Sequence, residues 1–427
     1  MYKNLYSYPF LETAYQGKPY YKLEELYDYV TSEGYEKHVI NHLDRNLYTS
    51  LNEHVRDNLI FLRETGLPSH KQEQFNFSNL NKLFNRDILN TNELAVSYLD
   101  RIEKFDYLVD PDILNEIILC DSNVLASETL SKRRPYNLQI LDISKINKNR
   151  HLEYVKLLDN TDNFSNLTYG LSRFPNVIVF PNGSKERYYK NPIKIKYANS
   201  SDEPILECNT TIIDVQYDTS VKIKESIQTR AGQMNYTTYI VRENSTLEIE
   251  RHSNDFGGWN LFDSRFICHP GSTVKIKFKN TGSSYTQENF YFKISSDVNV
   301  ELIGRNNIFK GNEYHQFVRV RSVDHDNRSI VDIKNVGDEH ARTSFVGKYE
   351  INSTSIGFDG QMDNRNLMLS PTANMHTRPI LDIYTKEIEC THGCTISNVD
   401  KDQLYYLQSK GFDKHSAKSL LIDSFLC

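Results

Sequence analysis

Short strand-like units of one shape recur along the middle of this chain. Six-residue units that start at 191, 219, 245, 272, 298, 329 and 353 mostly begin with a small or polar residue and then alternate apolar and polar, as in STLEIE and STVKIK. Their starts lie 28, 26, 27, 26, 31 and 24 residues apart. Alternation with period two is typical of a strand with one buried face. Near-equal spacing of such strands indicates a repeat architecture.

The length of the repeat discriminates between architectures. A propeller blade needs roughly 40–45 residues, which is longer than any interval here. No helical pattern lies between the strands, as a parallel βαβ unit would require. A β-helix with two or three short strands per coil fits the intervals best, because each coil buries its face against its neighbours. The alternative is an antiparallel β-sandwich, in which irregular spacing would be expected.

Helical patterns flank the repeat region. Near the N-terminus, apolar residues recur at three- and four-residue spacing, and Gly66 followed by Pro68 ends a helix. Near the C-terminus, Asp400 and Asp413 are expected N-caps of two helices, with Gly411 as the stop between them. We therefore predict three regions. They are a mainly helical domain with a small strand-containing segment (1–165), a β-helix core (166–397) and a C-terminal helical hairpin (398–427).

Composition restricts the partners and the compartment. The net charge is −6, which gives no electrostatic reason to expect nucleic acid or an anionic membrane as partner. No apolar run approaches the length of a membrane span, and the N-terminus lacks the apolar core of a secretory signal. The six cysteines are scattered rather than arranged as a disulfide framework, which favours free thiols in a reducing compartment.

One short stretch, ECTHGCTIS from 389 to 397, concentrates metal-ligating residue types. In an extended strand Cys390, His392 and Cys394 would point to one side. Thiolate and imidazole ligands suit zinc or an iron–sulfur species. No fourth ligand lies nearby in sequence, so a packing role for the cysteines stays open beside a metal site. A Cys–His nucleophile would need a positioning group and an oxyanion hole. The sequence shows no such positioning group or oxyanion hole, and it contains no common nucleotide-binding or protease motif. No enzymatic activity is therefore expected.

Two separated stretches resemble the SufD family, a subunit of the SUF iron–sulfur cluster assembly machinery. DGQMDNRNLMLS, TRPILDI and ECTHGCT, from 359 onward, are similar to the family's C-terminal motifs, and GLPSHKQEQFNFSNL (66–80) is similar to an upstream one. The cysteine and glutamate typical of the paralogue SufB are absent, which favours a SufD-like subunit. Thr391, Cys394 and Phe75 depart from the family's usual serine, alanine and tryptophan.

This resemblance implies a right-handed parallel β-helix between helical ends, in a complex with a SufB-like paralogue and the ABC ATPase SufC. It implies that Cys390 and His392 contribute to a transient iron or cluster site shared with SufB, with Cys394 as a further candidate ligand. It also implies that SufC docks on the C-terminal helices, for which the apolar candidates are Leu404, Tyr405, Leu407, Leu420, Leu421 and Phe425.

The resemblance leaves other properties to be decided. No tightly bound cofactor is expected, flavin binding is left open, and a homodimer is an alternative when SufB is absent. The expected compartment is a bacterial cytoplasm, with a plastid-type organelle as the alternative. Two rival functions remain, a self-contained metal or redox protein built on Cys390, His392 and Cys394, and a carbohydrate-binding β-helix protein.

Overall fold

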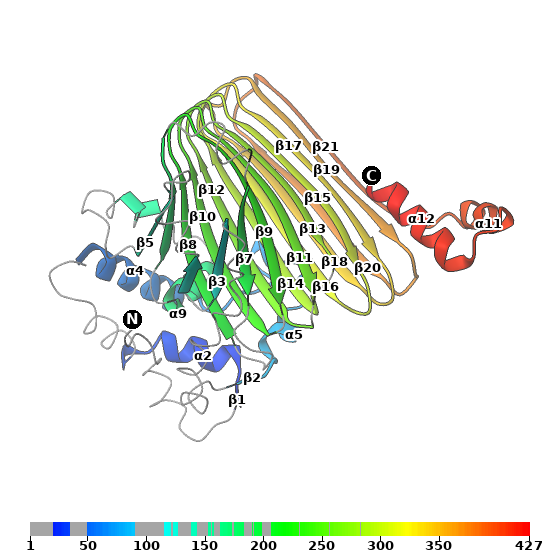
Figure 1. The fold of residues 1–427 in the computed structure, drawn as a ribbon, viewed down its shortest axis with the longest axis horizontal. Coiled ribbons are helices and arrows are strands. Elements are labelled where there is room, and N and C mark those ends of the chain that lie inside the picture. The colour runs from blue at the N-terminus through cyan, green and yellow to red at the C-terminus, as the bar shows by residue number, and fades with distance from the viewer. Residues whose placement is uncertain are drawn as a thin grey trace.

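A computed structural model describes residues 20–34, 49–89, 115–120, 123–126, 138–142, 153–154, 156–157, 163–172, 175–182, 190, 192–198, 206–229, 231–255, 257–281 and 283–427. Two large sheets face each other, and from residue 176 onward successive strands of the chain alternate between them (Figure 1). The nine-stranded sheet contains β5 (Gln139–Asp142), β6 (Asn176–Phe180), β8 (Leu206–Val215), β10 (Gly232–Val241), β12 (Trp259–Cys268), β14 (Tyr285–Ile294), β16 (Glu313–Ser322), β18 (Arg342–Ile351) and β20 (Asn374–Ile383).

The ten-stranded sheet forms the other wall. It contains β4 (Asn123–Ala126), β3 (Glu116–Cys120), β7 (Ile193–Ala198), β9 (Ser220–Thr229), β11 (Thr246–Asp255), β13 (Thr273–Asn280), β15 (Asn299–Ile308), β17 (Arg328–Gly337), β19 (Phe358–Met368) and β21 (Ile388–Asn398). From β7 and β8 onward every pairing is parallel, which confirms the parallel β-solenoid and shows that the sandwich alternative is wrong. Each turn of the solenoid has two strands, which decides between the two and three strands per coil that the sequence allowed.

The strand register corrects part of the sequence prediction. Val221, Leu247, Val274 and Val300 pair in succession, as the units at 219, 245, 272 and 298 predict. Val331, however, pairs with Leu302, two positions from the expected partner, and the unit at 353 falls in the turn before β19. An alternating pattern is unchanged by a two-residue shift, so only the turns decide between such registers.

One corner of the solenoid explains a recurrent Asp, Asn or Gly in the turns. Asp218, Asn244, Asp297 and Asp326 all have positive φ, between 52° and 57°, and glycine takes the same conformation at 271 and 357. At each of these positions the backbone N–H donates to a carbonyl of the following turn, for example Asn244 to Pro270 and Asp297 to His325. Asp, Asn and Gly tolerate this left-handed conformation best, which explains why these residue types recur at this position of successive turns.

The interior combines an aliphatic core with ordered polar ladders. Val221, Ile223, Leu247 and Ile249 belong to the continuous apolar cluster that fills the space between the sheets. On the ten-stranded sheet, Asn306 donates to Asn335 at 2.9 Å and Asn335 donates to Asn366 at 3.0 Å, with all three side chains fully buried. Such a ladder fixes the register because each amide satisfies the next one.

Breaking this ladder should be measurable. We expect Asn335→Ala to lower the free energy of unfolding by about 2 kcal/mol, because it leaves two buried amide groups without their partner. Asn307→Ala, next to the ladder but on the outward face, should change it by less than about 0.5 kcal/mol. Urea denaturation of the two variants compares them directly, and equal losses would contradict a stabilising role for the ladder.

The N-terminal elements cover the outer face of the nine-stranded sheet. They are β1 (Tyr20–Tyr21), α2 (Leu23–Val30), α4 (Thr49–Thr65), the 3-10 helix η1 (Glu73–Phe75), α5 (Leu80–Phe84), β2 (Ile88–Leu89) and α9 (Asn163–Leu171). A second apolar core joins them to the sheet, in which Leu62, Phe75 and Phe164 pack with Met234 and Trp259. Strand β10 is therefore buried on both faces.

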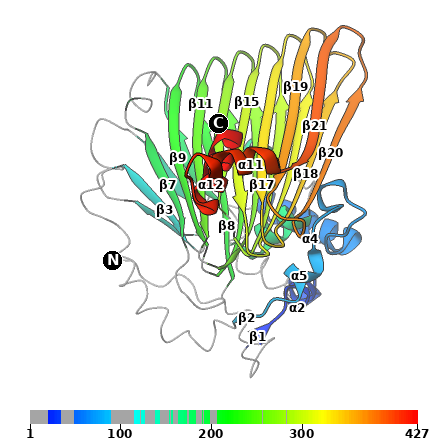
Figure 2. The ribbon, with the colours of Figure 1, turned by 90° about the vertical axis from the view of Figure 1, so that its right-hand side faces the viewer.

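The C-terminal hairpin lies over the outer face of the ten-stranded sheet (Figure 2). Its helices are α11 (Lys401–Ser409) and α12 (Lys414–Leu426), with Asp400 and Asp413 as N-caps, as predicted. Lys418 pairs with Asp338 at 2.7 Å, which ties α12 to the end of β17. In the part of the chain that the structure describes, no helix is both long and apolar enough to cross a membrane.

Candidate functional site

The C-terminal end of the solenoid is open. Strands β20 and β21 are the last in their sheets, and within the described part of the chain each is hydrogen-bonded to a neighbour on one side only. The predicted site residues Cys390, His392 and Cys394 all lie on β21, the last strand of the ten-stranded sheet (Figure 1). The site is thus an exposed sheet edge rather than a closed cavity, and such edges are templates for pairing with another chain.

The three residues share the inner face of β21. Cys390, His392 and Cys394 pair in register with Gly360, Met362 and Asn364 of β19. Met362 belongs to the core between the sheets, and Cys390 packs against the same core. Residues paired in a parallel sheet point to the same side, so all three face the solenoid interior where it opens. His392 is exposed and the two cysteines are half-buried.

Burial keeps both thiols protonated. Desolvation, with a smaller contribution from the Asp359 carboxylate, raises the pKa of Cys390 to about 11. Desolvation also raises the pKa of Cys394, and this effect is partly offset by Thr377 of β20 and by the backbone of Asn364. A thiol must lose its proton to act as a nucleophile or a metal ligand. In the free chain neither cysteine is therefore activated, which argues against a Cys–His nucleophile.

The reactivity of Cys390 tests this conclusion. A pKa of about 11 in place of the usual ~8.5 lowers the thiolate fraction at neutral pH about 300-fold. In a Cys427→Ser background, which removes the exposed C-terminal thiol, we expect Cys390 to be alkylated slowly at pH 7.5. Its rate should rise with pH until about pH 11. Cys427 of the unmodified chain is the reference, and peptide mass spectrometry separates the sites. Comparable rates at pH 7.5 would contradict the buried, protonated state.

The strand geometry does not form a closed metal site. Alternate residues of a strand are about 6.6 Å apart along the chain, so Cys390, His392 and Cys394 cannot all reach one ion. Among the described residues, one group of three has ligand atoms within 4.8 Å of one another, namely Asp297, His325 and Asp326 in exposed turns. Sequence reasoning missed this group, although the DHDN run from 324 is its visible signal. Exposed acidic groups of this kind are common without a ligand.

The strand opposite the site adds an apolar rim. Thr377 and Leu381 of β20 pair with Phe345 and Tyr349, which belong to the inner core, so they face the interior too. Around the opening, large apolar side chains remain exposed: Ile383 by 38%, Tyr384 by 68% and Ile396 by 44%. An uncapped core with exposed apolar residues marks a protein interface.

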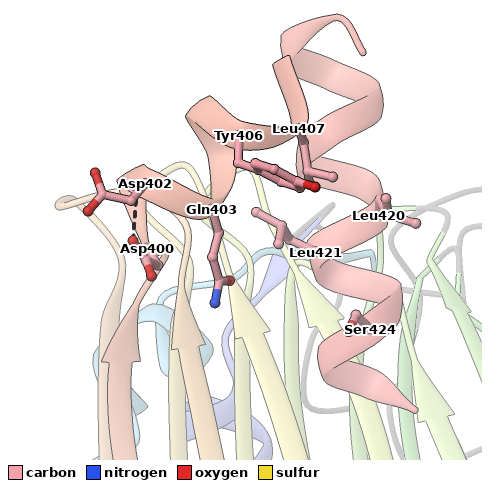
Figure 3. Close-up of a pocket in the computed structure, with 8 residues that line it drawn as sticks. All are labelled: Asp400, Asp402, Gln403, Tyr406, Leu407, Leu420, Leu421 and Ser424. Carbon is pink, nitrogen blue, oxygen red and sulfur yellow. Dashed lines mark hydrogen bonds between the residues drawn. The ribbon is translucent and has the colours of Figure 1, made fainter. Parts of the chain in front are cut away.

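The C-terminal hairpin carries a separate groove of about 440 Å³ between its two helices (Figure 3). Of the predicted docking residues, Leu407, Leu420 and Leu421 line it. Leu404, Tyr405 and Phe425 lie outside the groove, with Tyr405 exposed by 74% and Phe425 packed beside Lys334. The groove also contains Tyr406, which the sequence analysis missed because only the apolar spacing was considered.

A known family model matches the part of the chain that forms most of the solenoid and the C-terminal hairpin. Residues 197–425 match the family model described as "SUF system FeS cluster assembly, SufBD core domain", more than half of the chain. The chain belongs to the SufBD family. It is similar to an iron–sulfur cluster assembly SufBD family protein of Synechocystis, with 26% identity over 282 residues, or 62% of each chain.

Two further relatives match over shorter regions. The iron–sulfur cluster assembly protein SufD of Escherichia coli is 34% identical over 92 residues, which is 22% of each chain. The chloroplastic protein ABCI7 of Arabidopsis thaliana is 27% identical over 139 residues, 30% of this chain and 29% of the relative. The matches thus span 62% or less of the length of these relatives. The family model, in contrast, begins in β7 and ends in α12, so it includes the open end and the hairpin.

Proposed function

We propose that this chain is a SufD-type, non-catalytic subunit of a scaffold on which iron–sulfur clusters are assembled. The open end would pair with the corresponding end of a SufB-like paralogue. The observation that carries the proposal is the pair Cys390 and His392 on the inner face of β21, which among the described residues is hydrogen-bonded to a strand on one side only. They offer two ligand types for iron but too few ligands to hold it alone. A second chain at this edge would supply the others.

Iron or the nascent cluster is the cargo of such a scaffold rather than a resident cofactor. His392 would offer a neutral imidazole nitrogen and Cys390 a thiolate. Since the pKa of Cys390 is about 11 in the free chain, capture of iron by this thiol must release a proton. Binding should therefore weaken as the pH falls. The half-buried Cys394 lies too far along the strand to share one ion with Cys390, so it is a candidate ligand for another atom of a cluster on the same face.

The C-terminal hairpin would dock the ATPase partner, an ABC-type SufC. Tyr405, Tyr406, Phe412 and Leu420 of this hairpin are exposed by 43% to 74%, and the groove lies between its helices. Aromatic residues in a groove are typical anchors of protein interfaces. The two proposed interfaces lie on different faces, so one chain could engage both partners together.

A co-purification tests the proposal. The chain is expressed with its genomic neighbours and isolated through an affinity tag. We expect an ABC-type ATPase and a SufB-like paralogue to elute in a fixed ratio, and the ratio to survive gel filtration. A chain that elutes without either partner, from cells that express both, would contradict the proposed function. Light scattering of the isolated chain then tests whether it forms a homodimer when the paralogue is absent.

Two alternative functions have their own tests. A self-contained metal or redox protein would bind one zinc or iron per chain tightly, which the spacing on β21 disfavours. A carbohydrate-binding solenoid would retain acidic glycans on a column. Absorbance of the purified chain near 450 nm, measured alone and in the complex, tests whether a flavin binds. We propose a bacterial cytoplasm as the compartment, with a plastid-type organelle as the alternative.

A further inference from the structure

The two edge strands at the open end are supported differently. The outer face of β20 is contacted by a segment from the other end of the chain, residues 70–77. Among the described residues, no hydrogen bond, ion pair or stacked ring joins residues 20–89 to β21, and no N-terminal helix or strand packs extensively against it. The segment is a compact turn, because the Asn76 side chain donates to the carbonyl of His70 at 3.1 Å and a ring nitrogen of His70 lies 3.0 Å from the carbonyl of Phe75.

One side of this turn is anchored in the N-terminal core. Phe75 is fully buried and meets Phe164 edge-on, with ring centroids 5.1 Å apart. The Gln72 side chain donates to Asn163 at 3.0 Å, and Ser78 donates to Gln287 of β14 at 2.7 Å. The turn is therefore held by the rigid helices and by the middle of the nine-stranded sheet.

The other side of the turn reaches the last strand. Phe77 stacks on His376 of β20, with centroids 4.8 Å apart and planes within 5° of parallel. Arg378 of β20 donates to Asn76 at 3.3 Å. Lys348 of β18 lies between two carboxylates, that of Glu73 at 3.3 Å and that of Asp382 of β20 at 2.7 Å. Three outward side chains of β20 are thus tied to the turn directly or through one lysine.

We infer that residues 70–77 are a brace that holds β20 as a strand and so pre-forms the edge with which the SufB-like paralogue pairs. An edge strand bonded on one side frays more easily than an interior strand. A strand that is already ordered binds its partner without the entropy cost of ordering it. This inference rests on the proposed pairing of the open end. It assigns a function to the GLPSHKQEQFNFSNL motif, which the cluster chemistry leaves unexplained.

The brace makes a prediction for the free chain that does not depend on any partner. We expect Phe77→Ala and, separately, His376→Ala to speed hydrogen exchange of the β20 amides at least about tenfold, with β21 and β12 unchanged. His376 is exposed, so its replacement does not threaten the core. Asn374→Ala, on the same outward face of β20, is the matched control. Unchanged exchange of β20 in both variants, or equal acceleration of β20 and β21, would overturn the brace.

Binding to the purified paralogue tests the second half of the inference. Each variant should raise the dissociation constant about tenfold. The double variant should raise it by less than the product of the two single-variant factors. Faster exchange of β20 with unchanged affinity would show that the brace does not prepare the docking edge. If the unmodified chain fails to bind the paralogue while β20 responds as expected, the proposed function fails and the brace stands.

Discussion

Replacing Arg251 with methionine should lower the free energy of unfolding by about 3–5 kcal/mol. Arg251 is 1% exposed and lies between the sheets, where it donates to Glu225 at 2.7 Å and to Glu288 at 2.9 Å. Its guanidinium also stacks 4.1 Å from the ring centroid of Phe262. Without it, two carboxylates stay buried in the core with no cation, which costs far more than the loss of the contacts themselves.

The network around Arg251 is otherwise satisfied. Tyr239 donates to Glu225, Tyr314 donates to Glu288, and Arg251 also reaches the hydroxyl of Ser264 at 3.0 Å. Burial beside these carboxylates raises the pKa of both tyrosines well above its usual value, so they remain hydrogen-bond donors. Among the residues that the structure describes, the arginine is thus the one cation paired with these two buried acids.

Chemical denaturation checks this prediction against a matched control. Arg328→Met removes an exposed pair, in which the arginine lies 3.3 Å from Asp359 and both side chains are more than half exposed. That change should cost less than about 1 kcal/mol. A triple variant, Arg251→Met with Glu225→Gln and Glu288→Gln, should recover much of the lost stability, because no unbalanced charge is left. Equal losses for Arg251→Met and Arg328→Met would contradict the argument.

His392→Ala should lower the rate of cluster assembly by the reconstituted complex tenfold or more. Loss of a mere orienting partner of a ligand already costs roughly 10–100-fold in metal affinity or activity. His392 lies on the edge strand beside Cys390 and is exposed, so its removal leaves the solenoid core intact. The folded fraction and the pairing with the paralogue should therefore be unchanged.

The control for His392 is its neighbour on the other face. Thr391 is also exposed but pairs with Gln361 on the outward side of β19, so Thr391→Ala should assemble clusters at the normal rate. Cluster formation is followed by absorbance under anaerobic conditions, with subunit ratios measured in parallel. Normal assembly by His392→Ala would contradict its role as a ligand. A loss that accompanies disrupted pairing would instead indicate an interface residue.

Local patterns in the sequence determined the type of fold. The alternation in β9, β11, β13 and β15 predicts strands with one buried face, and their spacing predicts a solenoid. The caps at Asp400 and Asp413 also follow from nearest neighbours, since each carboxylate accepts from backbone N–H groups within three residues. The placement of Cys390, His392 and Cys394 on one strand face needed only the period of an extended chain.

Tertiary structure decided what depends on distant residues. The register of Leu302 with Val331 follows from the turn between them, because an alternating pattern fits equally well after a two-residue shift. The charge balance of Arg251 needs Glu288 from the opposite sheet, and the brace joins Phe77 to a strand 299 residues later in the chain. The opening that exposes His392 exists because β20 and β21 have no further turn to pair with among the described residues. Periodicity reports which face of a strand is buried, whereas folding alone decides which distant side chains meet there.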